Sequence, residues 1–590
     1  MTPPDPPATT PEPNPTPEPD AAGGAPGAPA VEADGEVTAG RTAAAAAAGP
    51  GWVRRGAGGG LTVLAALFVV FALVVPDDYA QLHAGAFVRL PLEALVAVAL
   101  LVVLPPRARR IAAVLVGVVL GLLTIVKVVD IGFTATLARP FDLVLDWILL
   151  GDATGVVEDS IGRLGAIVAV VLACLLVVAI LALMTLSVLR LTRLVAAHDR
   201  TALRTVAVLT VGWIACAAFG AQLAGGVPVA SRADATLVHD RGQQIRAGLH
   251  DKSQFAAEAA VDPFRNTPGS ELLTGLRGKD VLLTFVESYG RYAIEDPTYS
   301  APVRSLLDQG TTRLKAAGFE ARSAFLSSAT VGGGSWLAHA STLSGLYISN
   351  QQRYRTLTAS DRLTLPVAFR KAGWKTVSVE PAIDSAWPEG RFFGYEKDYD
   401  LRNLGYRGPR FSYATMPDQY TYAALQRAER QPGHAPLFAE ITTVSSHSPW
   451  TPIPTMVDWD RVGDGSIFAD PAYRQGGPPG SVVGDPAVLR TSYVSSIRYS
   501  LTALLSYVQR YGDENLVLVF LGDHQPSPVL TGPASRDVPI TIVAAPSVLA
   551  SVAGWNWTPG LRPDPKAPVW RMDAFRNRFL TAYGSTPASR

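Results

Sequence analysis

The stretch Leu516-Val-Leu-Val-Phe-Leu-Gly-Asp-His-Gln-Pro526 decides the fold class of this chain. Its first six residues, 516–521, form an apolar run with the length and composition of a buried strand. The run ends at Gly522, and Asp523 and His524 follow directly. Gly and Asp are ordinary turn residues, so a plain turn explains these three residues. An acid beside an imidazole at the end of a buried strand also fits a metal site, and both interpretations stay open at this point.

Composition indicates a membrane protein with a soluble part. The chain has 590 residues, 48% of them hydrophobic, a net charge of +1, and its apolar residues gather in the first half. The balanced charge gives no indication of nucleic-acid binding. Residues 1–50 are rich in Pro, Ala, Glu, Thr and Gly and contain almost no large apolar side chain. We therefore predict a disordered cytoplasmic tail there.

Five apolar runs predict a five-span transmembrane domain over residues 51–226. They lie near 61–76, 89–104, 111–129, 164–186 and 204–224. Most of them approach the roughly 20 residues that a bilayer-spanning helix needs. The second run is the weakest, because Pro91 and Glu93 interrupt its start.

The distribution of arginine predicts the orientation in the membrane. Arginines precede the first run, separate the second from the third, and separate the fourth from the fifth, at Arg54, Arg55, Arg107, Arg109, Arg110, Arg190, Arg193, Arg200 and Arg204. By the positive-inside rule these segments are cytoplasmic. An odd number of spans then exports the rest of the chain, which we divide into a linker at 227–265 and an extracellular catalytic domain at 266–590. The cysteines, Cys174 and Cys216, fall within the runs, so we expect no disulfide in the exported domain.

The exported part alternates between strand-like runs and helical patterns. The strand-like runs lie at 280–287, 319–326, 374–379, 437–443, 516–521 and 538–543, and helical patterns at 363–372 and 488–511. Such alternation predicts an α/β domain with a largely parallel sheet. Ligands of such sheets lie beyond the carboxyl ends of the strands.

Polar side chains follow three of these strands. Glu287 ends the first strand, His447 follows another, and Asp523 and His524 end a third. Each alone is consistent with a capped turn or a solvated edge. Together they predict a metal or catalytic site at one edge of the sheet.

A nucleophile is supplied by the segment 330–345, Thr-Val-Gly-Gly-Gly-Ser-Trp-Leu-Ala-His-Ala-Ser-Thr-Leu-Ser-Gly. Three glycines allow a sharp turn, and 336–343 reads as a helix, which places Ser335 at a helix N-terminus. Free N–H groups and the helix dipole favour an anion such as phosphate there. A simple N-cap is the alternative role of this serine.

Four short motifs together resemble the alkaline phosphatase and sulfatase superfamily. They are Val281-Leu-Leu-Thr-Phe-Val-Glu-Ser288, the Gly-Gly-Gly-Ser335 turn, Thr443-Val-Ser-Ser-His447 and Gly522-Asp-His524. Five spans before an exported domain resemble the lipoteichoic acid synthase type of membrane phosphoglycerol transferase. The resemblance implies an alkaline-phosphatase-like fold for the exported domain.

The resemblance also implies a metal site and a mechanism. Glu287, Ser335, Asp523 and His524 would hold one divalent ion, Mn²⁺ first, with Mg²⁺ or Zn²⁺ as alternatives, since oxygen-rich ligation with a single imidazole suits a hard ion. Ser335 would attack a phospholipid phosphodiester and form a phosphoserine enzyme, which a cell-envelope glycan or lipid acceptor, or water, would resolve.

Three further residues are implied to bind substrate. His447 matches the substrate-binding histidine of the family and would bind phosphate or protonate the leaving oxygen. The segment Trp387-Pro-Glu-Gly-Arg-Phe-Phe-Gly394 resembles a Trp and Arg substrate segment with a shifted spacing. Arg391 would form a bidentate contact with phosphate, and Trp387 would contact the substrate.

The chain departs from the family at several positions. The synthases have Thr where Ser335 stands, and a histidine of the synthase pocket is replaced near Glu380, which puts glycerol phosphate in doubt as the substrate. Leu337 and His339 depart from the sulfatase motif, so we expect neither formylglycine nor sulfatase chemistry. Few histidines are present after residue 266, so we expect no second metal.

Three classes of function remain open. The first is a membrane-anchored transferase of a phospho-alcohol headgroup, similar to phosphoglycerol. The second is an extracellular hydrolase of phosphate esters, in which water is the acceptor. The third is a non-catalytic envelope protein that keeps the fold for binding.

Overall fold

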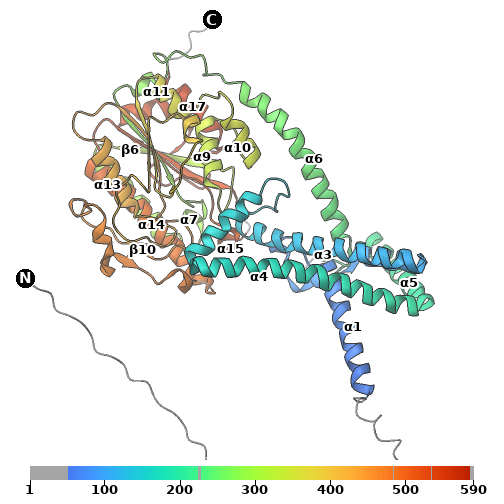
Figure 1. Cartoon of the computed structure of the whole chain (residues 1–590). Coiled ribbons are helices and arrows are strands. Elements are labelled where there is room, and N and C mark those ends of the chain that lie inside the picture. The colour runs from blue at the N-terminus through green and yellow to red at the C-terminus, as the bar shows by residue number, and fades with distance from the viewer. Residues whose placement is uncertain (1–50, 224–226, 483, 533–534, 585–590) are drawn as a thin grey trace, which may run out of the picture. The chain divides into compact units, whose positions relative to one another are not determined.

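The computed structural model describes residues 51–223, 227–482, 484–532 and 535–584. Its first part is helical, and its second part is an α/β domain around one large sheet (Figure 1). The helices of the first part are α1 (Gly51–Val74), α2 (Leu92–Val103), α3 (Pro106–Leu137), α4 (Trp147–Ala197), α5 (Asp199–Ala218) and α6 (Ala233–Ala260). The predicted tail, 1–50, lies outside the described residues.

Three helical segments in the described residues are long and apolar enough to span a membrane. They are Pro106–Leu137, Ile161–Ala197 and Asp199–Ala218. The first two predicted runs fold into shorter apolar helices, Gly58–Val74 and Leu92–Val103. Prolines bound α2, with Pro91 at its N-cap and Pro105 just beyond its end, so α2 has only 12 residues. A membrane region is therefore confirmed, but a count of five full-length spans is not.

The sheet of the second part has nine strands in the order β14-β6-β13-β12-β5-β9-β7-β8, with β15 beside β6. The five neighbours β12, β5, β9, β7 and β8 run parallel, whereas β13 is antiparallel to β12 and to β6. The strands are β5 (Asp280–Val286), β6 (Glu320–Ser327), β7 (Lys375–Glu380), β8 (Lys397–Asp400), β9 (Leu437–Thr442), β12 (Leu516–Gly522), β13 (Asp537–Ala544), β14 (Thr558–Pro559) and β15 (Val569–Arg571). The predicted, largely parallel sheet is confirmed.

Helices cover both faces of this sheet (Figure 1). One face packs against α8 (Ala301–Ala316), α13 (Asp418–Glu429) and α14 (Pro486–Tyr511). The other packs against α9 (Ser335–Ser344), α10 (Gln351–Thr358), α11 (Leu365–Lys371) and α17 (Ala574–Tyr583). Every residue of β5, β9 and β12 is buried, because side chains on both faces meet a helical layer. This explains why these strands read as continuous apolar runs.

A buried ion pair joins the segment that enters the domain to its last helix. Both oxygens of the Asp262 carboxylate accept hydrogen bonds from Arg576 on α17, at 2.9 and 2.8 Å, and both side chains are fully buried. Arg362 lies 3.2 Å from the same carboxylate. Burial would raise the pKa of Asp262, but the two guanidinium groups outweigh it and lower that pKa. The carboxylate is therefore held ionised between two cations.

Replacement of Asp262 by Ala should destabilise the folded domain strongly. It leaves two buried guanidinium groups without their counter-ion, which costs about 3–5 kcal/mol. Denaturant unfolding of the full-length protein in detergent, followed by tryptophan fluorescence, measures this change. Asp361→Ala is the matched control, because its pair with Arg265 is largely exposed and contributes below about 1 kcal/mol. Equal shifts for the two variants would contradict the argument.

Candidate active site

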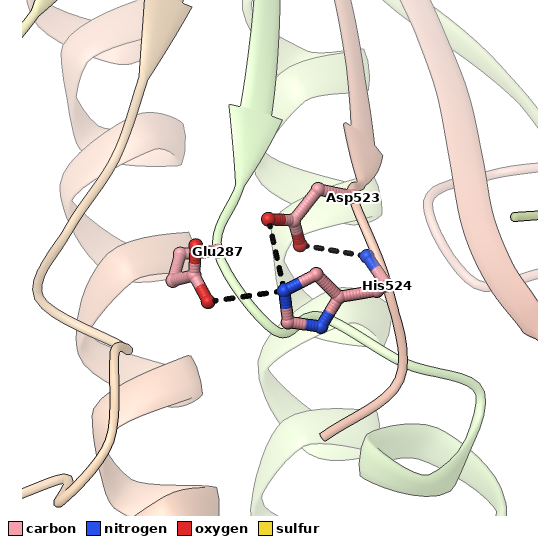
Figure 2. A group of neighbouring side chains, drawn as sticks. All are labelled: Glu287, Asp523 and His524. Carbon is pink, nitrogen blue, oxygen red and sulfur yellow. Dashed lines mark hydrogen bonds and ion pairs between the residues drawn. The ribbon is translucent and has the colours of Figure 1, made fainter. Parts of the chain in front are cut away.

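Two neighbouring parallel strands deliver the first two acidic residues to one edge of the sheet. In the pairing of β5 with β12, Val286 lies opposite Gly522, so Glu287 and Asp523 follow paired positions. His524 comes next along the chain after Asp523. All three side chains are at least nine-tenths buried. The predicted convergence of Glu287, Asp523 and His524 is present in the structure (Figure 2).

Ser335 reaches this group from the glycine turn. Gly332, Gly333 and Gly334 have φ values of 71°, 155° and 77°, which residues with a side chain rarely adopt. Gly334 is the N-cap of α9, and Ser335 is the first helical residue. The hydroxyl of Ser335 therefore does not cap helix α9. Its Oγ donates to Glu287 Oε2 at 3.2 Å and lies 3.3 Å from His524 Nε2.

The imidazole of His524 presents Nε2 to the two carboxylates. Nδ1 lies 2.8 Å from the carbonyl oxygen of Gln525, so we assign the proton to Nδ1. Nε2 is then an acceptor, 3.5 Å from Glu287 Oε1 and 3.5 Å from Asp523 Oδ2 (Figure 2). A metal-binding histidine is usually oriented in this way by a hydrogen bond from its other nitrogen.

The carboxylate of Asp523 has one oxygen satisfied and one free. Oδ1 accepts hydrogen bonds from the backbone N–H groups of Ser288 and His524, at 2.8 and 2.7 Å. Oδ2 is buried and has no hydrogen-bond partner among the described residues. Burial, followed by repulsion from Glu287, raises the pKa of Asp523 to about 6.

The pKa of His524 is also raised. Burial alone would lower it, but attraction to Asp523 and Glu287 outweighs burial. A divalent cation would satisfy the free Asp523 oxygen and relieve the repulsion between the two carboxylates. The donor set of carboxylate oxygens, one hydroxyl and one imidazole therefore fits one divalent ion.

Ser335 also lines a cavity of about 280 Å³. Its walls include His447 and Trp387, as the sequence predicted, together with Glu287. Arg391 is exposed and lines a separate surface hollow beside Glu389. The structure therefore brings six of the seven predicted site residues together and leaves Arg391 outside the group.

His447 is positioned by a stacked tyrosine and by the next backbone carbonyl. Its ring stacks on Tyr413 with the centroids 3.7 Å apart, and Nδ1 lies 2.6 Å from the carbonyl oxygen of Ser448. Burial lowers the pKa of His447 to about 4, so the imidazole is neutral at pH 7. With the proton on Nδ1, Nε2 is left as an acceptor.

Three residues in the walls of this cavity were not predicted from the sequence, namely Glu440, Tyr354 and Tyr413. A signal was present for Glu440, because it interrupts the otherwise apolar strand β9 and is only 1% exposed. A glutamate is almost never fully buried without a partner or a function. The two tyrosines carry no comparable local signal, since their place in the cavity comes from tertiary packing.

Comparison with known proteins supports the predicted superfamily. The Sulfatase family model matches residues 306–535, which include Ser335, His447, Asp523 and His524. This confirms the sulfatase-like character of that part of the chain. No curated protein sequence matches the chain.

Similarity to solved structures is low, with TM-scores below 0.5 for the three structures named here. The lipoteichoic acid synthase LtaP from Listeria monocytogenes is 16% identical over 54% of this chain and 74% of its own, with a TM-score of 0.37. The integral membrane lipooligosaccharide phosphoethanolamine transferase A (EptA) from Neisseria meningitidis is 14% identical over 88% of this chain and 95% of its own, with a TM-score of 0.44. The phosphoglycerol transferase GacH from Streptococcus pyogenes is 14% identical over 49% of this chain and 74% of its own, with a TM-score of 0.31.

Metal affinity should fall as the pH is lowered through about 6. Below the raised pKa of Asp523 a proton competes with the cation for the carboxylate, so the Kd for Mn²⁺ should rise about tenfold per pH unit there. Calorimetry on the full-length protein in detergent, between pH 5 and 7.5, measures this.

The Asp523→Asn variant should bind Mn²⁺ at least about 10–100-fold more weakly at pH 7. Asp308→Asn is the matched control, because Asp308 is an exposed residue of α8 that pairs with Arg562. A Kd that does not change with pH, or that is the same in the Asp523 and Asp308 variants, would rule out this site.

Proposed function

We propose that this chain, with a sulfatase-like domain after a helical membrane region, is a membrane-anchored, metal-dependent phosphotransferase. It moves a phospho-alcohol headgroup from a phospholipid to a cell-envelope glycan or lipid acceptor, on the outer side of the membrane. The observation that carries the proposal is the position of Ser335. Its Oγ lies 3.2 Å from Glu287 and 3.3 Å from His524, at a helix N-terminus that opens into a cavity.

The residues around Ser335 suit phosphoryl transfer. Glu287, Asp523, His524 and the Ser335 hydroxyl would hold one divalent ion, with Mn²⁺ as the first candidate. A bound ion of this kind lowers the pKa of a coordinated hydroxyl and neutralises charge on phosphoryl oxygens. Free backbone N–H groups in the first turn of α9 favour the phosphate at the same place.

The first half-reaction makes a covalent enzyme. The Oγ of Ser335 attacks the phosphorus of the donor, so an Oγ–P bond forms and the P–O bond to diacylglycerol breaks. The Oγ proton is lost, and the leaving alkoxide takes up one proton to become the lipid alcohol. The product is a phosphodiester between Ser335 and the headgroup alcohol.

His447 serves the second half-reaction. Its imidazole is neutral at pH 7 and has a free Nε2, so it accepts the proton of the incoming hydroxyl. This differs from the role of proton donor that the family resemblance implied, because a neutral ring with its proton held by Ser448 has none to give at Nε2. The acceptor oxygen bonds to phosphorus, the Oγ–P bond breaks, and Oγ takes up one proton while His447 loses the one it accepted, so the Ser335 hydroxyl and the neutral imidazole are restored.

The Ser335→Ala variant should lose all turnover above background and retain its fold. The test uses the full-length protein in vesicles with Mn²⁺ and a donor lipid labelled in its acyl chains and headgroup. Wild type should release diacylglycerol and show the headgroup phosphate on the peptide that contains Ser335, by mass spectrometry. Ser305→Ala is the matched control, because Ser305 is an exposed residue of α8.

Three outcomes separate the classes of function. Release of the headgroup phosphate to water, whatever acceptor glycan is present, would identify a hydrolase. Transfer to the glycan would support the proposed transferase. Unchanged turnover in Ser335→Ala would overturn the covalent mechanism, and absence of turnover in wild type with every donor would favour a binding protein.

A further inference from the structure

A second group of ionisable side chains lies in the Ser335 cavity, apart from the proposed metal ligands. It consists of Glu380, Glu440 and His339, which we call the acidic subsite. Glu380 is the last residue of β7, Glu440 lies within β9, and His339 is on α9. One ligand atom of each lies within 4.8 Å of the other two. Three separate elements therefore bring these groups together.

The two carboxylates of the acidic subsite lack a counter-ion. Among the described residues that line the cavity there is no lysine and no arginine. Glu440 is 1% exposed, and its Oε2 accepts a hydrogen bond from the Tyr395 hydroxyl, but none of the described residues donates a hydrogen bond to its Oε1. Glu380 accepts one hydrogen bond from Thr442, at 2.9 Å.

Burial is the main reason why the pKa of each carboxyl is raised. The pKa of Glu380 rises to about 7, and that of Glu440 rises well above its usual range, with repulsion from Glu380 adding to burial. Burying carboxylates is costly unless a cation pairs with them. The unpartnered oxygen of Glu440 and the neighbouring Glu380 therefore form a site for a cation.

His339 carries no charge that could compensate the carboxylates of the acidic subsite. Nδ1 of His339 lies 3.4 Å from Glu440 Oε1, and its ring stacks on Phe285 with the centroids 3.8 Å apart. Its Nε2 is buried, and none of the described protein groups accepts a hydrogen bond from it. Burial lowers the pKa of His339 to about 4, so the ring is neutral and does not compensate the carboxylates.

Aromatic rings complete the wall of the cavity. Tyr354, Trp387 and Phe393 line it, and Trp387 stacks on Phe393 with the centroids 5.7 Å apart. The ring centroid of Tyr395, whose hydroxyl donates a hydrogen bond to Glu440, lies 6.3 Å from that of Trp387. Aromatic faces attract an ammonium group but are not ligands for a hard metal ion.

We propose that the acidic subsite binds the ammonium group of the headgroup that Ser335 transfers, so that the substrate is an amino-alcohol phosphodiester. An ammonium group has three N–H donors, and Glu380, Glu440 and His339 offer three acceptors. A neutral glycerol headgroup would leave the two buried carboxylates uncompensated. The proposal rests on the proposed function, since it assigns the substrate of the same cavity.

The first test measures binding without turnover. Full-length Ser335→Ala protein, loaded with Mn²⁺ in detergent, is titrated by calorimetry with O-phosphoethanolamine and with glycerol phosphate. We expect about tenfold or greater preference for the ammonium compound, from charge-assisted hydrogen bonds and cation–π contact. Glu440→Gln and Glu380→Gln, each made in the Ser335→Ala protein, should lose this preference. Glu320→Gln is the matched control, because Glu320 lies on β6 and does not line the cavity.

The second test measures turnover of matched lipids by protein with Ser335 intact. Phosphatidylethanolamine and phosphatidylglycerol with identical acyl chains are supplied in vesicles, with glucose or glucosamine glycosides as acceptors. Wild type should show a higher kcat/KM for the ammonium donor, and Glu440→Gln should lower the ratio of kcat/KM for the ammonium donor to that for the neutral donor about tenfold. A Glu440→Gln effect that follows the amine of the acceptor instead would overturn the assignment to the donor.

Other outcomes separate this inference from the proposed function. Selective binding of O-phosphoethanolamine with no turnover of either lipid would retain the subsite and remove the transferase. Turnover that requires Ser335 but shows equal use of both lipids, with no loss in Glu440→Gln, would retain the transferase and remove the subsite. Two bound Mn²⁺ per wild-type chain, falling to one in Glu440→Gln, would identify a second metal site and overturn the ammonium assignment. Thermal unfolding of each variant verifies that it is folded.

Discussion

The parallel pairing of β5 with β12 is the constraint on which the candidate site depends. It places Val286 opposite Gly522, so the next residue of each strand is a carboxylate delivered to the same edge of the sheet. Parallel strands cannot be joined by a tight turn, so Glu287 and Asp523 come from distant parts of the chain. A one-residue slip would turn one of the two side chains to the other face of the sheet. The fully buried apolar strands fix that register, and with it the separation of the ligand atoms.

The domain contains two kinds of carboxyl group, those that are paired with arginine and those that are not. Asp262 is ionised because Arg576 and Arg362 surround it, and this cluster holds the entry segment against the last helix. Asp523 and Glu440 are buried and Glu380 is half-buried, none of them paired with an arginine or lysine among the described residues, and burial raises the pKa of each carboxyl. Natural proteins keep uncompensated buried carboxylates mainly where a ligand or a reaction needs them. By this contrast, Asp262 is a structural acid, whereas Asp523, Glu380 and Glu440 are candidates for functional acids.

Most of the sheet and the core of the site could be predicted from the sequence, because both rest on local patterns. Continuous apolar runs predicted β5, β9 and β12 within a residue, and the turn after each run predicted Glu287, Asp523 and His524. The count of five membrane spans is not confirmed, because Pro91 and Pro105 limit α2 to 12 residues and only three helical segments of the described residues are long and apolar enough to span. Arg391 was placed by resemblance to a segment with altered spacing, and the structure puts it on an exposed surface outside the cavity. Glu440 lay within a correctly predicted strand, but its meaning depends on Glu380 and His339, which the sequence does not show to be its neighbours.

The order of the strands places the two proposed cation sites side by side. β12 and β5 supply the proposed metal ligands, and β9 and β7, the next two strands of the sheet, supply Glu440 and Glu380. Adjacent strands lie about 4.8 Å apart, so the two acidic groups are separated by roughly 5–10 Å along the sheet. A metal ion held by Glu287 and Asp523 and a charged amine at the acidic subsite would therefore each lie against the strand pair whose carboxylates it neutralises.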